Sequence, residues 1–461
     1  MMAPMDDGRL EQVREGVDAL ARALSDERFR HVAGLDREPA IAAVFDVHGR
    51  AADRDTVAEL REKGDRDLAA RVAALAAERA AAPDEEAWRA ADSAATGPGP
   101  DGPVGISDAA LALLHERDRE RRRELGRAVA DGSATASTPR EACAEIRARA
   151  RASLGLTPPW EDVVGADEVL SASEAAYGDV LSWLARRDGI ELPPRGDLDR
   201  TALLRLLAAR DLDGLFRPAA LHQVVLEGFD GLGIDVRRVR LDGGARAAKW
   251  PGAHAFEGRL SLRRQGGAAD WVDLLDAAGR ATAAAASRPS TRDPALPATV
   301  GALGASLLLE PRFLERATGI DRKKSKDVVR RLALRGLFAL RASAAALRVA
   351  AEVERGTSGR AWREAHQEAL SRAALATWPD GLAARDADAE MHRTALAGAA
   401  WAAQIQADLR NRFDEDYWRN PRTAEALAGR LAAGRPGPEK ERPPLAIAAE
   451  ALVARLGGGT S

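Results

Sequence analysis

The fold of the chain is decided by residues 271–286, WVDLLDAAGRATAAAA, which a proline-rich segment, SRPSTRDPALP, follows. Apolar residues recur in this stretch at the three- and four-residue spacing of one helical face, so it predicts a helix. Asp276 and Arg280 stand four residues apart and share a face of that helix, about 6 Å apart at Cβ. An acid that precedes a base by one turn predicts contact between the two side chains.

The regions around this helix are also mostly helical. A run of amphipathic segments predicts an N-terminal helical region over residues 1–150, and a larger helical domain over 151–456 precedes a short tail at 457–461. The glycine- and proline-rich stretch TGPGPDGPVG (96–105) is predicted to be a linker or a long loop. Alternating apolar and charged residues in IDVRRVRLDGG and GRLSLRRQGG predict one small antiparallel sheet near 234–267.

The composition excludes several classes of protein. The 68 Lys and Arg residues nearly balance 71 Asp and Glu, which leaves a net charge of −3 and no basic field for nucleic acid. The single cysteine, Cys143, excludes a disulfide framework and multi-cysteine metal sites. No apolar stretch is long enough to span a bilayer, and the N-terminus has no secretory pattern. We therefore expect a soluble, cytoplasmic protein that binds neither nucleic acid nor membrane.

Familiar catalytic motifs are absent from the sequence. It has no GxSxG elbow, no phosphate-binding glycine loop and no pair of histidines at i and i+4, so HExxH does not occur. The segment WREAHQEAL places Glu364, His366 and Glu368 on one predicted helix, where surface charge is the simplest interpretation. The basic segment 321–331 is interpreted as a solvated helix start, because no aromatic residue is interleaved for base stacking.

From about Leu170 onward, a series of short stretches in a fixed order resembles the thimet oligopeptidase and oligoendopeptidase F group of gluzincin metallopeptidases. The matching stretches include ASEAAYGDVLSWLARRDGI (172–190), AALHQVVLEGFDGLGIDV (219–236), LDGGARAAKWPGAHAF (241–256), LLLEPRFLERATGI (307–320) and WAAQIQADLRNRFDEDYWRNPRTAEAL (401–427). The resemblance implies a mainly α, zincin-like fold of the oligopeptidase type, helical and clam-shaped. It also places the family's zinc helix, which typically ends LxHExGHAxH, on the stretch that contains DLLDAAGR.

The resemblance carries no complete zinc site to this chain. The two histidine ligands fall on Asp276 and Arg280, the general-base glutamate falls on Ala277, and the third ligand, a glutamate, falls near Ala298. Catalytic zinc needs three protein ligands and an open position, and the attacking water needs a carboxylate base. The family's tyrosines, expected just before Trp401, are also missing. We therefore expect no metal, no cofactor and no catalytic residues.

The leading hypothesis is a catalytically inactive metallopeptidase homologue whose cleft holds peptides or a protein partner. One alternative is a peptidase with a relocated site at Glu364, His366 and Glu368. Another is a helical scaffold protein that assembles through its N-terminal helices. The helix at 271–286 could also belong to an unrelated helical protein.

Overall fold

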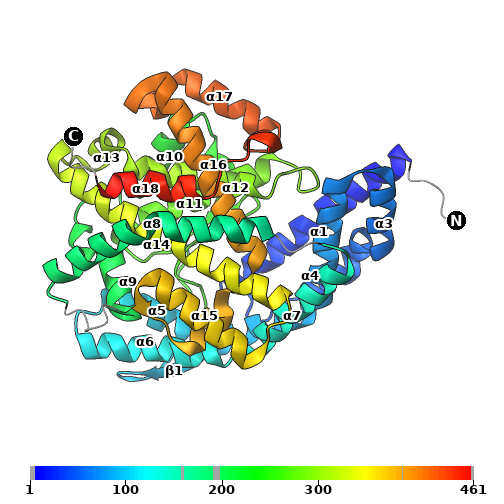
Figure 1. Cartoon of the computed structure of the whole chain (residues 1–461), viewed down its shortest axis with the longest axis horizontal. Coiled ribbons are helices and arrows are strands. Elements are labelled where there is room, and N and C mark those ends of the chain that lie inside the picture. The colour runs from blue at the N-terminus through cyan, green and yellow to red at the C-terminus, as the bar shows by residue number, and fades with distance from the viewer. Residues whose placement is uncertain (1–5, 157–159, 191–197, 387, 458–461) are drawn as a thin grey trace.

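The computed structural model describes residues 6–156, 160–190, 198–386 and 388–457, and it is 75% helical (Figure 1). The predicted mainly α fold is confirmed. The helices are α1 (Asp7–Val32), α2 (Ile41–His48), α3 (Arg54–Lys63), α4 (Arg66–Ala94), α5 (Ile106–His115), α6 (Arg119–Ala134), α7 (Ser137–Ser153), α8 (Trp160–Arg187), α9 (Arg200–Ala208), α10 (Leu221–Gly231), α11 (Gly267–Ala286), α12 (Ala295–Ser306), α13 (Pro311–Thr318), α14 (Arg322–Glu354), α15 (Gly359–Ala374), α16 (Ala389–Phe413), α17 (Pro421–Ala432) and α18 (Ala446–Leu456).

The strands are short and form three small sheets. They are β1 (Thr96–Gly99), β2 (Gly102–Gly105), β3 (Leu198–Asp199), β4 (Arg240–Asp242), β5 (Gly252–Phe256), β6 (Arg259–Arg263) and β7 (Ala376–Thr377). The predicted sheet near 234–267 has the strand order β4-β6-β5. It is mixed rather than wholly antiparallel, because the chain reverses direction twice between β4 and β6 and these two strands run parallel. Two further sheets were not expected: β1 and β2 form a hairpin within the predicted linker, and β3 pairs with β7.

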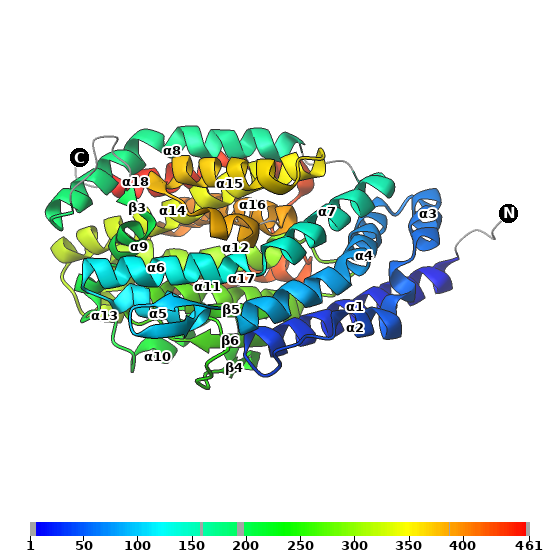
Figure 2. The same cartoon turned by 90° about the horizontal axis from the view of Figure 1, so that it is seen from below.

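Three large apolar cores hold the helices together. The first joins α1 to α4, and the second joins α5 and α6 to α8, α14, α16 and α18. The third lies beneath the mixed sheet, among α10 to α13, α16 and α17. In the view of Figure 2, α8, α15 and α18 lie along one side of the molecule and the sheet along the other, with α11, α12 and α16 between them. Because α5 and α6 share a core with later helices, the predicted boundary at residue 150 does not coincide with a division between cores and remains a prediction.

No helix in the described part of the chain is long and apolar enough to cross a membrane. The predicted tail lies almost wholly outside the described residues, which end at Gly457.

Candidate functional site

Helix α11 carries the positions at which the sequence places the degenerate zinc site. It begins at Gly267, after a short turn that follows β6, and Gly266 is its N-cap residue; the φ angles of Gly266 and Gly267 are +88° and +60°. A Cβ on Gly267 would lie 1.7 Å from Asp213 Oδ1, so only glycine fits this turn. The helix then buries Trp271 and Leu275 in the third core, and the predicted helix at 271–286 is confirmed.

Asp276 and Arg280 contact each other, as their spacing predicts. Arg280 Nε donates a hydrogen bond to Asp276 Oδ2 over 2.6 Å, and the two side chains are 31% and 32% exposed. The pair packs over Gly301 of α12, where a Cβ would come within 2.6 Å of Asp276 Oδ1 and 2.7 Å of Arg280 Cγ. The two expected ligand positions therefore hold an ion pair that rests on the backbone of the neighbouring helix.

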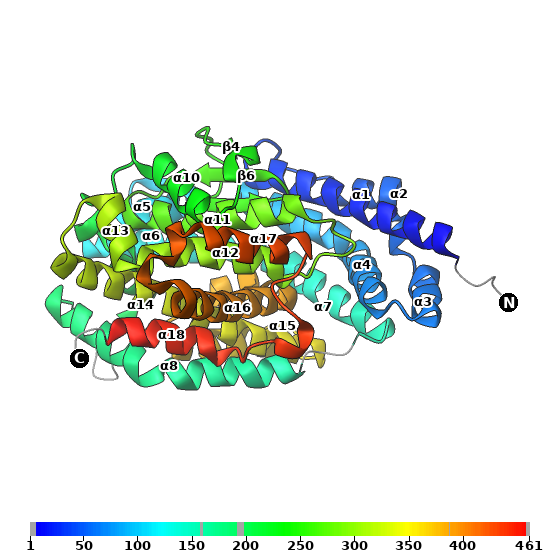
Figure 3. The same cartoon turned by 90° about the horizontal axis from the view of Figure 1, so that it is seen from above.

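The other two positions of the degenerate site are buried. Ala277 on α11 and Ala298 on α12 are each 1% exposed. α12 lies between α11 and α16 (Figure 3). A Cβ on Gly279 would lie 2.6 Å from the carbonyl oxygen of Val300, and a Cβ on Gly398 of α16 would lie 2.4 Å from the Cβ of Ala298. The three helices thus pack through glycine and alanine, with no room for larger side chains at these contacts.

A second acid on α11, Asp273, lies one turn before Asp276 and is also neutralised. Arg335 of α14 lies 2.9 Å from Asp273 Oδ1, and Gln265 donates its amide N–H to Oδ2 over 2.9 Å. Burial raises the pKa of the Asp273 carboxyl, and Arg335 acts in the opposite direction. Burial also lowers the pKa of nearby His254 on β5. Among the described residues, no group of three or more His, Cys, Asp and Glu side chains is arranged to hold a metal ion.

The alternative site on α15 does not assemble. His366 is fully buried, whereas Glu364 and Glu368 are 59% and 71% exposed and pair with the arginines one turn away from them, Arg360 and Arg372. The histidine and the two acids therefore lie on different faces of the helix, as residues two apart must.

Neither tyrosine of the chain replaces the missing family tyrosines. Tyr177 is buried and donates its hydroxyl to the carbonyl oxygen of Ala374. Tyr417 is buried beside Glu310 and accepts a hydrogen bond from Gln406 Nε2 over 3.0 Å. The positions before Trp401 are small residues that pack against α12, so the tyrosine positions are occupied by helix contacts.

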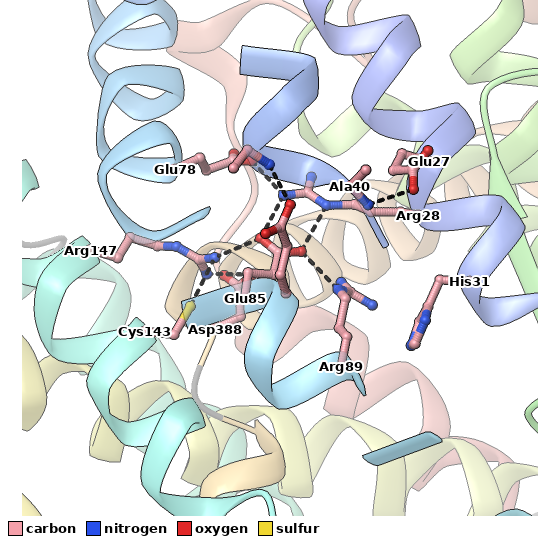
Figure 4. A network of polar contacts seen from close by, with 12 residues as sticks. Glu27, Arg28, His31, Ala40, Glu78, Glu85, Arg89, Cys143, Arg147 and Asp388 are labelled. Atoms are coloured by element: carbon pink, nitrogen blue, oxygen red, sulfur yellow. Dashed lines mark hydrogen bonds and ion pairs between the residues drawn. The ribbon is translucent and has the colours of Figure 1, made fainter. Parts of the chain in front are cut away.

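A buried charge network, which sequence reasoning missed, joins the N-terminal helices to the start of α16 (Figure 4). Glu85 of α4, 3% exposed, accepts hydrogen bonds from Arg28 of α1 over 2.9 Å and from Arg89 over 2.9 Å. Arg147 of α7 reaches both Glu85 and Asp388, the N-cap residue of α16, at 3.4 Å. Burial alone would raise the pKa of Glu85, but the arginines together hold it well below its ordinary range. In the sequence, the four-residue spacing of Glu85 and Arg89 within α4 is the one feature that indicates part of this network.

Comparison with solved structures places this geometry in a known fold. The chain is similar to a putative oligoendopeptidase F from Bacillus anthracis, with a TM-score of 0.58 and 11% identity over 98% of this chain and 85% of that one. It is also similar to PZ peptidase A, solved with an inhibitor, with a TM-score of 0.55 and 14% identity over 96% of this chain and 84% of that one. A third similar structure, BsuCP, has a TM-score of 0.52 and 11% identity over 96% of this chain and 97% of that one.

No family model and no curated protein sequence matches the chain. The likeness to these solved structures establishes the fold. The chain has the mainly helical fold of the oligopeptidase-type metallopeptidases.

Proposed function

We propose that the protein is a catalytically inactive relative of the metallopeptidases whose fold it has, a pseudopeptidase that binds peptides or a protein partner without cleaving them. The observation that carries the proposal is the packing of α11, α12 and α16 through Gly279, Gly301 and Gly398. This close packing supports the proposal, because it leaves little room for a larger ligand side chain at Ala298.

The chemistry of the side chains supports the same conclusion. A zinc-bound water needs a nearby carboxylate to take its proton, and the methyl group of Ala277 cannot do so. The guanidinium of Arg280 carries a permanent positive charge, which opposes a divalent cation in its vicinity. Asp276 is the one potential ligand at these positions, and its Oδ2 already accepts the hydrogen bond from Arg280.

Metal content and peptide hydrolysis test the loss of activity. We expect the purified protein, after incubation with zinc and removal of the excess, to retain no stoichiometric metal. We also expect it to leave a mixture of internally quenched fluorescent peptides intact, while an active peptidase of the same fold serves as a positive control. Stoichiometric zinc together with cleavage that a chelator abolishes would overturn the proposal.

The position of β5 favours a peptide as the ligand. In the described chain β5 pairs with no strand other than β6, although α11 and α1 lie beside it. We propose that its second edge accepts an extended peptide as an added strand. In a hairpin with a two-residue turn, the two residues that flank the turn form backbone hydrogen bonds with each other, and hydrogen-bonded pairs then alternate along the strands. The backbone groups of Phe256 and His254 therefore bond to β6, and the backbone N–H of Ala255 points to the opposite edge of β5.

Binding of fluorescent peptides to two variants tests this ligand class. Ala255→Pro removes the outward N–H and should abolish binding, whereas Ala255→Val keeps the N–H and should preserve it. Equal binding by both variants would exclude strand addition at β5 and leave the inactivity proposal untouched.

A scaffold function has weaker support. The first core, shared by α1 to α4, gives the N-terminal helices a hydrophobic core of their own. The buried network around Glu85 nevertheless ties α1 and α4 to α7 and α16, so these helices belong to the same packed body.

A further inference from the structure

The C-terminal turn of α8 and the first turns of α14 lie at the end of the molecule opposite α1 and α3 (Figure 1). A tryptophan of α8, Trp183, lies beside Arg330 of α14. Trp183 is 38% exposed. The guanidinium carbons of Arg187 and Arg330 lie 5.3 and 5.7 Å from the centre of its ring. Cations at this distance from an aromatic ring are attracted to it, so both guanidinium groups interact with the ring of Trp183.

Basic side chains extend from this ring along both helices. On α14, Lys323, Lys326 and Arg330 are spaced at i, i+3 and i+7, so they form one stripe that ends at Trp183. On α8, Arg186 follows the tryptophan by three residues and lies on the same face. We call these five residues the Trp183 patch.

The charges of the patch are largely unmatched. The neighbouring Arg187 is surrounded by three acids, Asp188, Asp211 and Asp327. By contrast, within the described chain no carboxylate forms an ion pair with Arg186, Lys323 or Lys326, all of which are exposed. Asp321 at the start of α14 interacts electrostatically with Lys323 without forming an ion pair, so all three side chains are available to an acid of another molecule.

The patch also differs from the rest of the molecule in composition. Three of the six lysines in the chain lie at positions 323, 324 and 326, although the whole chain has a net charge of −3. A local positive surface on a slightly negative molecule orients an approaching negative partner toward that surface.

We propose that the Trp183 patch docks an acidic peptide segment of a partner protein, with an apolar side chain of the segment on the tryptophan ring. Tryptophan and arginine are the residues that most often dominate binding at protein interfaces. Surrounding lysines supply complementary charge for glutamate and aspartate. The proposal concerns a different face from α11 and does not depend on the loss of peptidase activity.

A protein segment fits this surface better than nucleic acid. Surfaces for single-stranded nucleic acid place several aromatic rings under successive bases. The basic segment 321–331 contains no aromatic residue, and the neighbouring end of α8 supplies the single ring of Trp183. One ring with surrounding charge matches one apolar anchor in an acidic segment.

Fluorescence anisotropy with a short, labelled, glutamate-rich peptide that carries a central leucine tests the proposal. We expect Lys326→Glu and Trp183→Ala each to weaken binding about tenfold. Lys440→Glu makes the same charge change at an exposed lysine outside the patch and should alter affinity by less than about twofold. Circular dichroism of each variant verifies that it is folded.

Several outcomes would overturn this assignment. Absence of binding, or equal binding of the same peptide with glutamine in place of glutamate, would remove the role of charge. Equal losses for Lys326→Glu and Lys440→Glu would mean that attraction is spread over the molecule. Tighter binding of a single-stranded oligonucleotide than of the acidic peptide would assign the surface to nucleic acid instead.

Discussion

Arg280 Nε lies 2.6 Å from Asp276 Oδ2 on the face of α11 that packs over Gly301 of α12. The acid precedes the base by one turn, which is the favourable order on a helix. The pair neutralises two charged groups where the helix is only partly open to solvent.

A double-mutant cycle in denaturant unfolding measures the interaction free energy between Asp276 and Arg280. Because both side chains are about one-third exposed, we expect a coupling free energy between Asp276→Ala and Arg280→Ala of less than about 1 kcal/mol. Strictly additive effects of the two substitutions would mean that the contact contributes nothing to stability. A coupling of several kcal/mol would mean that the pair behaves as a buried one.

The glycine contacts between α11 and α12 make a sharper prediction. Gly279→Ala places a methyl group 2.6 Å from the Val300 carbonyl oxygen and should destabilise the protein by about 2 kcal/mol or more, since the backbone must shift. Gly429 on α17 is the matched control, because a Cβ there meets no atom within 4 Å. At this control position alanine should stabilise the helix by up to about 1 kcal/mol. Equal effects at both positions in denaturant unfolding would show that α11 and α12 are not closely packed.

Part of this site could be predicted from the sequence, and part could not. The helix at α11 and the contact between Asp276 and Arg280 follow from local spacing, and both are confirmed. The ion pair between Asp273 and Arg335 joins residues 62 positions apart, and nothing in either segment specifies the partner. Such pairs depend on how α14 packs against α11, which is a property of the whole core.

The small sheets, too, could be predicted only in part from the sequence. Alternation predicts a strand at β6, where Leu260 and Leu262 are buried. The residues before β4 alternate equally well, yet Val236 belongs to a 3-10 turn. The paired strand that follows is limited to the three residues Arg240–Asp242. Glycine and proline at 96–105 indicate a break in the helices, but they do not reveal that the break forms a hairpin.

Restoring the zinc ligands should fail for a steric reason. The combined substitutions Asp276→His, Ala277→Glu, Arg280→His and Ala298→Glu supply the missing groups, but Ala298 packs against Gly398 with no space for a larger side chain. We expect the variant to unfold at a lower denaturant concentration and to bind no zinc, because overpacking and an uncompensated buried charge both destabilise a core. Ala305→Glu, at a partly exposed position of the same helix, is the control for the change in charge. A folded variant that binds zinc stoichiometrically would show that α12 can move away from α16.

The network around Glu85 predicts a dependence of stability on pH. Its folded-state pKa is lower than its unfolded value, so its ionised form stabilises the protein at pH values above the unfolded pKa of about 4.3. This stabilisation is lost as the pH falls below that value toward the folded pKa. Glu85→Gln leaves Arg28, Arg89 and Arg147 without their shared buried partner. We therefore expect it to lower the free energy of unfolding by about 3 kcal/mol at neutral pH.

The difference in unfolding free energy between Glu85→Gln and the natural protein should narrow as the pH falls below about 4. The Glu85 carboxyl of the unfolded chain then takes up a proton, whereas the folded protein still holds it ionised, so the unfolded state gains stability. Glu78→Gln is the matched control: Glu78 is 27% exposed and contacts Arg28 alone among the arginines of the network. Glu78→Gln should lower the free energy of unfolding much less than Glu85→Gln does, because Arg28 remains paired to Glu85 and water can solvate it. Unfolding by urea across the acidic pH range measures both variants. A difference for Glu85→Gln that stays constant down to pH 3 would contradict the ionised network, and the stabilisation would then have to come from packing of the Glu85 side chain.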